Sequence, residues 1–256
     1  MTIIKTVASS PLKEAYHQVM DRVAQTAGRC NRRLQDIIVV AVTKTASPDQ
    51  IRTLVEMGHG DLGENRIQQL TQRVVQLEEF LSRKRSLGRT TNEVTEVIPH
   101  IRWHMIGHLQ RNKVKQVLGL VKLIHSVDSL RLVEEIQNTA ARSEQVVDIL
   151  LEVNASGDPA KQGVAAPAAA HLAEQIDTML NIRLRGLMTM ASLVENPQDA
   201  RPTFARAAEI YHDICDGGAC GKNFNILSMG MTNDFEIAIE EGANVLRIGR
   251  ALFGDG

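Results

Sequence analysis

The chain has 256 residues, 43% of them hydrophobic, and its 29 Lys and Arg residues nearly balance its 30 Asp and Glu residues. This length can fill one large core, but length alone does not separate one barrel from two smaller domains. The balanced charge argues against binding to nucleic acid or a membrane surface, so a small or locally complementary partner is expected.

The chain shows neither a disulfide framework nor a membrane or export segment. Cys30, Cys215 and Cys220 are too few and too unevenly spaced for disulfides or for a paired zinc motif. The N-terminal residues lack the apolar core of a signal peptide, and no apolar run reaches membrane-spanning length. We expect a soluble, cytoplasmic protein and, because no large apolar patch is evident, a monomer.

Apolar runs alternate with amphipathic stretches along the chain, which is the βα pattern. An amphipathic helix is expected first, over residues 12–27. Strands are then expected at residues 37–44, 58–65, 101–108, 122–129, 146–154, 182–190, 224–230 and 244–249. Helices are expected from Pro48, from Asn65, and over residues 108–118, 128–140, 165–180, 200–215 and 233–241. Eight such units predict one domain over residues 1–256, a single (β/α)8 TIM-type barrel with an additional N-terminal helix.

Two helices show their ends in the sequence. Ser47 and Pro48 are typical of an N-cap and a first helical residue. Near the C-terminus, Asn233 and Glu236 fit a capping box, and Gly242 occupies a position typical of a left-handed C-cap.

Residues 79–100 depart from the repeating pattern, with mixed charge and few apolar residues. We expect an extended helix end followed by a mobile loop. The basic run "RKR" at residues 83–85 is interpreted as part of a solvated segment, with a docking patch as the alternative.

The carboxyl ends of barrel strands carry the chemistry in folds of this kind. The residues at these ends are Lys44, Glu64, Asn65, His104, His108, His125, Asp128, Asn154, Met188, Ser228 and Arg247. They are much more polar than the strands that precede them, so we expect a functional site at this face.

The loops "SMGMTND" and "RIGRALFG" each lead from a strand through a glycine into a helix. Helix N-termini bind phosphate through backbone N–H groups, and phosphate sites on such barrels follow strands seven and eight. We therefore place Ser228, Gly230, Met231, Gly249 and Arg250 around a phosphate. One such loop could equally be a tight turn with a helix cap, but two adjacent loops favour the phosphate.

Lys44 ends a strand of β-branched residues and would face this phosphate site across the barrel mouth. An amine and a phosphate anchor in one cavity suit pyridoxal 5′-phosphate held as an aldimine. Partial desolvation favours the neutral amine, which attacks an aldehyde. A lysine that only reaches solvent, or pairs with Glu64, remains the alternative.

The motifs "VAVTKT", "GENR", "WHMIGHLQRNK", "RGLMTM" and "SMGMTNDFEIAIEEGANVLRIGRALFG" together resemble the pyridoxal phosphate homeostasis protein family, the alanine racemase N-terminal-like proteins. The resemblance covers roughly Ile37 to Gly254. It implies a single (β/α)8 barrel that holds pyridoxal 5′-phosphate on Lys44, buffers the cofactor and takes part in vitamin B6 and amino and keto acid homeostasis without robust catalysis.

By the same resemblance, Arg247 matches the arginine that meets the pyridine nitrogen in larger racemases, and Ser228 and Gly249 match phosphate contacts. No residue is predicted to be catalytic or to bind a metal. The predicted cofactor residues are Lys44, Asn65, His104, Met188, Ser228, Gly230, Met231, Arg247, Gly249 and Arg250. The implied partners are pyridoxal 5′-phosphate, amino acids and apo-enzymes that accept the cofactor.

Racemases of this fold also need a second base, a tyrosine from an extra β domain. We expect it to be missing, because Tyr16 and Tyr211 fall in predicted outer helices and the chain ends at Gly256. A charged Arg247 at the ring nitrogen would also disfavour its protonation and weaken the ring as an electron sink.

Parts of the sequence are compatible with other functions. A racemase-like enzyme dependent on the same cofactor is the main alternative. A Schiff-base aldolase would usually carry its lysine on a later strand. A metal pair of His104 and His108 lacks further ligands, and "DGGACGKNF" lacks the first glycine and the Ser or Thr of a phosphate loop. A regulatory protein would use residues 83–89 as its docking surface.

Overall fold

The computed structural model describes residues 10–91, 99–218 and 220–254. The strands are β1 (Ile38–Val42), β2 (Asp61–Glu64), β3 (Arg102–Met105), β4 (Leu123–Val127), β5 (Val147–Asn154), β6 (Val164–Ala165), β7 (Ile182–Met188), β8 (Ile226–Ser228) and β9 (Val245–Ile248). The helices are α1 (Pro11–Arg29), α2 (Pro48–Glu56), α3 (Ile67–Thr91), α4 (Val114–Val117), α5 (Leu130–Arg142), α6 (Ala169–Asp177), α7 (Arg201–Asp216), α8 (Phe235–Glu240) and α9 (Arg250–Phe253).

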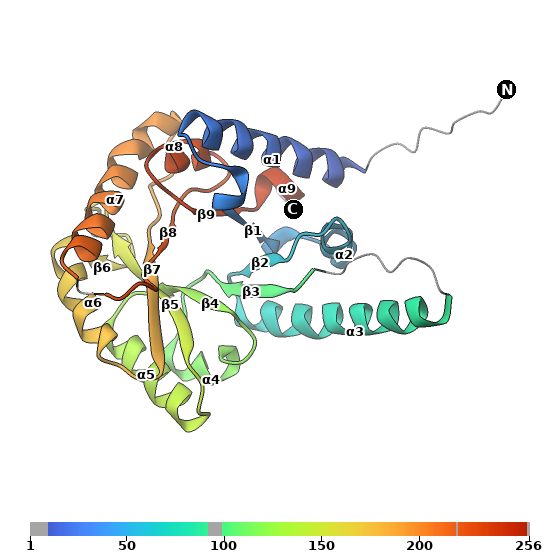
Figure 1. The fold of residues 1–256 in the computed structure, drawn as a ribbon, viewed down its shortest axis with the longest axis horizontal. Coiled ribbons are helices and arrows are strands. Elements are labelled where there is room, and N and C mark those ends of the chain that lie inside the picture. Colours follow the sequence, from blue (N-terminus) through green and yellow to red (C-terminus); the bar gives the residue numbers. More distant parts are fainter. Residues whose placement is uncertain (1–9, 92–98, 219, 255–256) are drawn as a thin grey trace.

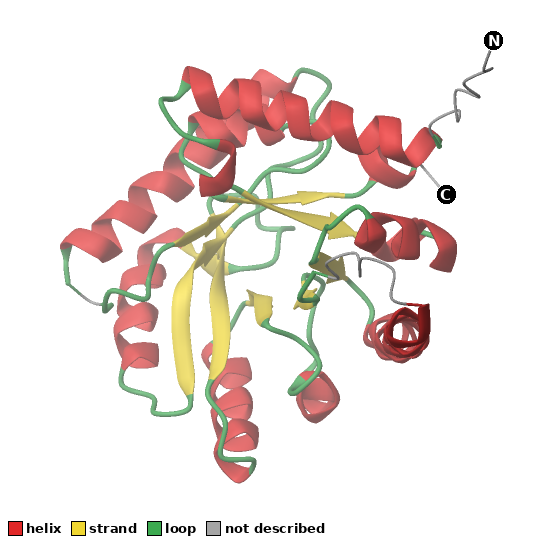
Figure 2. Cartoon of the chain, turned by 45° about the vertical axis from the view of Figure 1, so that its right-hand side comes forward, coloured by secondary structure: helices red, strands yellow, loops and turns green. Residues whose placement is uncertain are grey.

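Parallel strands close into a barrel. Their order around it is β1, β2, β3, β4, β5, β7, β8 and β9, and β9 pairs back onto β1 with Ile38 opposite Val245. The short β6 is attached to the end of β5 and lies outside the barrel order. Figure 2 shows the strands at the centre with the helices around them. The predicted (β/α)8 barrel with an additional N-terminal helix is therefore confirmed.

The predicted strands are all present, but several helix boundaries differ from the prediction. The helix expected at residues 108–118 is reduced to α4, preceded by a 3₁₀ turn over Arg111–Lys113. The helix expected at residues 165–180 begins only at Ala169, after β6 and a further 3₁₀ turn. In both segments short-range turns compete with the α-helix, and hydrophobic spacing alone does not separate them.

The helix ends give a mixed result. Ser47 caps α2 with Pro48 as its first residue, as predicted, and Gln50 completes a capping box. The capping box predicted for Asn233 is wrong, because α8 begins at Phe235 and its N-cap is Asp234. The Asp234 carboxylate accepts a hydrogen bond from the Met231 backbone N–H instead.

Hydrophobic side chains fill the space between the barrel and its helices. Helix α7, for example, turns Phe204, Ala207, Ile210 and Ile214 inward, and all four are buried. Full burial stabilises a side chain such as Phe or Ile by about 1.5–3 kcal/mol. A separate small cluster of Leu123, Leu150 and Met188 comes from adjacent strands.

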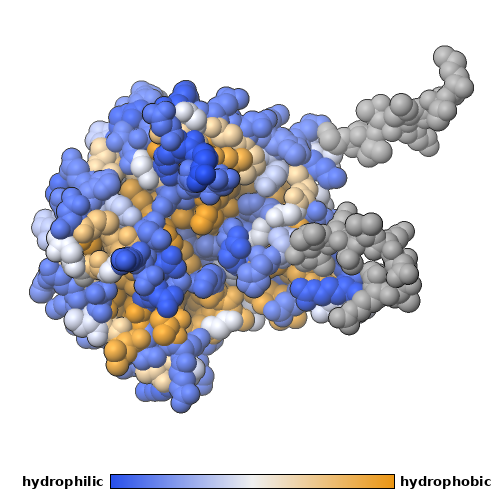
Figure 3. Space-filling model, viewed as in Figure 1, coloured by the Kyte–Doolittle hydropathy of each residue, from blue (hydrophilic) through white to orange (hydrophobic). Residues whose placement is uncertain are grey.

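Helices α1 and α3 extend the molecule on one side (Figure 1). Helix α1 packs on α8 and α9, where Arg22 forms an ion pair with Glu236 at 2.9 Å. Seen from the same side, polar residues cover much of the helical layer and hydrophobic residues show between them (Figure 3).

The segment predicted as an extended helix end is helical as far as Thr91, while the predicted loop at residues 92–98 lies outside the described residues. Within the "RKR" run, Lys84 pairs with Glu56 of α2 at 2.9 Å and Arg83 pairs with Glu79. Two of the three basic residues in this run therefore form ion pairs within the protein itself. None of the helices described is both long and apolar enough to cross a membrane.

Candidate functional site

Lys44 lies at the barrel mouth, but two residues beyond the end of β1. It sits in a 3₁₀ turn over Thr43–Thr45, and its side chain is exposed rather than partly desolvated. The strand ends at Val42, since the chain turns there toward Ser47 and α2. The position at the mouth agrees with the prediction, while the expected desolvation does not.

Arg73 of α3 stabilises this turn through hydrogen bonds to its backbone. Its guanidinium donates to the carbonyl of Thr43 and, at 3.0 Å, to that of Ala46, so it brackets Lys44. The same group pairs with Glu64, which is fully buried and also accepts from the Thr43 hydroxyl at 2.9 Å. Glu64 therefore binds Arg73, and the alternative pair between Glu64 and Lys44 is not formed. Arg73 was not predicted, because its contacts with this turn depend on how α3 packs against it.

Asn65 follows β2 next to this turn. Its backbone N–H donates to Glu64 Oε1 at 2.9 Å, but its side-chain Oδ1 is buried and meets no hydrogen-bond partner among the described residues. Gly107 approaches so closely that a Cβ there would lie 2.3 Å from the Asn65 carbonyl oxygen. A buried acceptor without a donor is costly, so this oxygen is suited to receive a donor from a ligand.

The loops after β8 and β9 lie side by side. The carbonyl of Gly230, whose φ is +92°, accepts from the Arg247 backbone N–H at 3.0 Å. Thr232, which was not predicted, accepts from the Ala251 N–H at 3.3 Å and so joins one loop to the other. A Cβ on Gly249 would lie 3.3 Å from that of Val42, which places this loop beside the Lys44 turn.

The remaining two residues predicted around the phosphate also lie on these loops. Met231 is exposed, and its backbone N–H donates to Asp234 at 2.6 Å. Arg250 is the first residue of α9 and is exposed. The first turn of any helix presents backbone N–H groups without intrahelical acceptors, so α9 can contribute such groups here.

Ser228 and Arg247 face the barrel interior rather than the open mouth. Arg247 donates to Ser228 Oγ at 2.7 Å and to the Thr189 carbonyl at 2.9 Å, and both side chains are buried. The predicted phosphate contact of Ser228 therefore finds its hydroxyl already engaged. Burial lowers the pKa of Arg247 to about 10, although Glu152 and Asp234 oppose the shift, so the guanidinium is charged at neutral pH.

His104 is also an interior residue, and both its ring nitrogens have protein partners. Nδ1 lies 3.0 Å from Nε2 of His125, and Nε2 lies 3.2 Å from the Asp61 carboxylate. His108, in contrast, is exposed and pairs with Asp128 at 3.4 Å. The two histidines therefore face different surroundings, and each ring nitrogen of His104 already has a protein partner.

The floor of the mouth has an apolar side and an acidic one. Met188, predicted near the cofactor, is fully buried in the cluster with Leu123 and Leu150. On neighbouring β5, Glu152 is 2% exposed, and burial together with the nearby Asp128 raises its pKa to about 7. Glu152 was not predicted, although a carboxylate in the run "DILLEVN" is a signal that could have indicated it.

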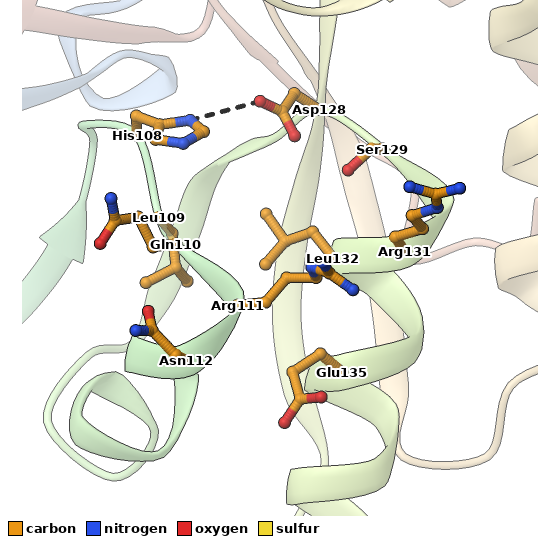
Figure 4. A pocket seen from close by; sticks show the side chains of 10 residues that line it. All are labelled: His108, Leu109, Gln110, Arg111, Asn112, Asp128, Ser129, Arg131, Leu132 and Glu135. Atoms are coloured by element: carbon orange, nitrogen blue, oxygen red, sulfur yellow. Dashed lines mark ion pairs between the residues drawn. The ribbon is translucent and has the colours of Figure 1, made fainter.

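A surface pocket of about 690 Å³ opens on the rim beside β3 and β4. In Figure 4 the His108–Asp128 pair closes one end, and Arg111, Arg131 and Glu135 line the sides between α4 and α5. It contains none of the residues predicted for the cofactor, so it is separate from the Lys44 turn.

Comparison with known proteins gives consistent matches. Residues 19–256 match the family model described as the alanine racemase N-terminal domain. Proteins named pyridoxal phosphate homeostasis protein are 36% identical in Aquifex aeolicus, with 94% of this chain and 97% of the relative covered, and 31% identical in Pseudomonas aeruginosa, with 96% of each covered.

Solved structures agree in fold. PipY of Synechococcus elongatus, determined with PLP bound, is 25% identical with a TM-score of 0.73, covering 91% of this chain and all of PipY. An alanine racemase of Clostridium difficile is 13% identical with a TM-score of 0.66, covering 96% of this chain but 56% of the racemase. That second likeness concerns the fold alone.

Proposed function

The chain belongs to the pyridoxal phosphate homeostasis protein family and matches the alanine racemase N-terminal domain, and we propose that it binds pyridoxal 5′-phosphate covalently through the Lys44 amine. In this proposal the protein holds and exchanges the cofactor in the cytoplasm, and takes part in vitamin B6 and amino and keto acid homeostasis without robust catalysis.

One observation carries the proposal: the Lys44 turn and the loops after β8 and β9 meet at one place on the barrel mouth. Gly249 lies against Val42, directly before the turn, and Thr232 joins the loop after β8 to the start of α9. When bound, the cofactor supplies an aldehyde that condenses with a primary amine and a phosphate that needs anion donors. Lys44 and the N–H groups of these loops offer both.

The surrounding residues support the fit. The unpartnered Oδ1 of Asn65 offers an acceptor for a donor on the ligand. Arg73 and Glu64 fix the backbone on both sides of Lys44, so the backbone position from which the Lys44 side chain extends is defined although the side chain itself is exposed. Such an exposed amine can exchange the aldehyde with free amino acids, or release it to apo-enzyme acceptors.

The positions of the tyrosines support binding rather than racemisation. Tyr16 OH lies 3.4 Å from His59, which precedes β2, and Tyr211 stacks on Phe224, which precedes β8. Both therefore lie at the amino ends of the strands, opposite the mouth. Burial also raises the pKa of Tyr211 to about 12, which makes it a poor base at neutral pH. We expect the loaded protein to racemise alanine no faster than the free cofactor does.

The test is a visible absorption titration with pyridoxal 5′-phosphate, before and after borohydride reduction. The protein should take up one cofactor per chain, and reduction should fix it on a peptide that contains Lys44. Lys44→Ala should abolish this, whereas Lys115→Ala, which removes an exposed lysine of α4, should not. Pyridoxal, which lacks the phosphate, should bind more weakly.

Two results would refute the proposal. Equal labelling of the Lys44→Ala and Lys115→Ala variants would show that the aldehyde reacts with surface lysines without a site. Equal affinity for pyridoxal and its phosphate would remove the role of the loops after β8 and β9.

A further inference from the structure

A chain of buried side chains crosses the barrel interior. Arg247 of β9 donates to Ser228 of β8 at 2.7 Å, and Ser228 Oγ lies 3.0 Å from Nδ1 of His125 on β4. His125 Nε2 lies 3.0 Å from His104 Nδ1 on β3, whose Nε2 is 3.2 Å from Asp61 on β2. Because β5 and β7 separate β4 from β8 in the barrel wall, the contact between Ser228 and His125 spans the interior.

The members of this chain are buried and their ends are charged. Ser228 and His125 have no exposed surface, and the others are at most 8% exposed. At one end Arg247 has Glu152 and Asp234 as charged neighbours. At the other end Arg102 binds Asp61, with Nε 2.7 Å from Oδ1. Burial opposes ionisation of Asp61, but hydrogen bonds from Arg102 and His104 outweigh it and hold its pKa well below the usual range.

These two ends fix every proton between them. The ionised Asp61 only accepts, so a neutral His104 carries its proton on Nε2 and accepts at Nδ1. His125 must then donate from Nε2 and accept at Nδ1, and the Ser228 hydroxyl must donate to it. Arg247 donates to the Ser228 oxygen, which closes the sequence with every hydrogen bond satisfied.

Protonation of either ring breaks the sequence. A charged His104 would place a hydrogen on Nδ1 and force the His125 proton onto its own Nδ1, facing Ser228. The Ser228 oxygen would then receive two donors, and its own hydrogen would lose its acceptor in a fully buried site. Burial, followed by the positive charge of Arg247, lowers the pKa of His125 well below its ordinary value, which favours the neutral ring.

We propose that His125 and His104 are positioning residues, which hold Arg247 and Ser228 beneath the barrel mouth. They do so through a chain of hydrogen bonds in which each group donates to the next, from Arg247 to Asp61. Arg247 pairs in register with Val40, and its backbone N–H donates to the Gly230 carbonyl, so its backbone lies directly beside the loop after β8. The consequence for cofactor binding rests on the proposed function; the proton positions do not.

The first experiment measures those proton positions without any cofactor. In protein labelled with ¹⁵N-histidine, long-range ¹H–¹⁵N spectra distinguish a protonated from an unprotonated ring nitrogen. In spectra recorded at pH 8, His104 and His125 should each carry a single ring proton, located on Nε2. A proton on Nδ1 of either ring in these spectra would overturn the proposal.

Variants then test positioning. His104→Gln keeps a donor and an acceptor, whereas His104→Met keeps neither. His104→Met should weaken cofactor binding about tenfold, which corresponds to about 1.4 kcal/mol, and His104→Gln should restore most of it. His59→Gln is the matched control, because His59 is buried and binds the Asp61 carbonyl but lies outside the chain.

Unfolding midpoints show whether each variant is folded at the titration temperature. Equal losses in His104→Met, His104→Gln and His59→Gln would overturn positioning, because they would report general damage to the core. If His104→Met does not fold, the ring protons of the unaltered protein still decide the proposal. If the unaltered protein takes up no cofactor, the proposed function fails, while the spectra continue to decide the chain.

Discussion

The pair of Arg73 and Glu64 allows a demanding test of how the Lys44 turn is held. Arg73→Met would leave the Glu64 carboxylate, which has no exposed surface, without its cation, and would remove donors from the carbonyls of Thr43 and Ala46. Breaking a buried pair by removing one partner costs about 3–5 kcal/mol, because the remaining charge is uncompensated. We expect a loss of about 4 kcal/mol of unfolding free energy.

Urea unfolding followed by far-ultraviolet circular dichroism measures this loss. The control is Arg206→Met, since Arg206 pairs with Glu209 on the surface of α7 and should contribute less than about 1 kcal/mol. Adding Glu64→Gln to Arg73→Met should recover part of the stability, because an amide replaces the stranded carboxylate. The reasoning is wrong if Arg73→Met costs no more than the control, or if the second change destabilises the variant further.

Three other predictions concern substitutions of residues inside the barrel or at its mouth. The pKa of Asp61 is lowered in the folded protein, so its ionised form contributes stability that is present above its unfolded-state pKa near 4 and is lost as the pH falls. Asp61→Asn should therefore reduce the pH dependence of the unfolding free energy in acid. Glu152 has a raised pKa, so the protein should lose up to about 3 kcal/mol of unfolding free energy as the pH rises from about 4.5 to 7. Glu152→Gln should remove this pH dependence in urea titrations across the same range. Gly107→Ala should displace the Asn65 backbone, weaken cofactor uptake and lower the melting temperature, whereas Gly28→Ala in α1, with open space around it, should leave both nearly unchanged.

The barrel could be predicted because its signal is local and repeated. Each strand is a short apolar run and each long helix is amphipathic, so the order of elements was readable without knowledge of contacts. The failures came where local geometry decides, as at Asn233, which a capping pattern favoured although the helix begins two residues later. A sequence pattern cannot distinguish adjacent Asn and Asp residues that compete for one cap.

The sequence indicated where the candidate site residues lie along the chain, but not which way their side chains face. Lys44, Gly230 and Gly249 lie at the mouth as expected, because the carboxyl end of a strand can be inferred from the end of its apolar run. Ser228 and His104 stand at comparable strand ends yet bind His125 across the barrel interior, a contact that depends on how the strands close into the barrel. Arg73 could not have been found, since its role depends on how α3 packs against the turn.

Closure of the barrel also constrains how the protein is made. The pairing of Ile38 with Val245 joins an early strand to a late one, so the last seam cannot form until the ribosome has released nearly the entire barrel. Contacts of such long sequence separation form slowly. Until then β1 presents an unpaired edge, and the nascent chain must avoid aggregation through it. A protein of this topology is therefore expected to depend on chaperones during synthesis more than its final stability would suggest.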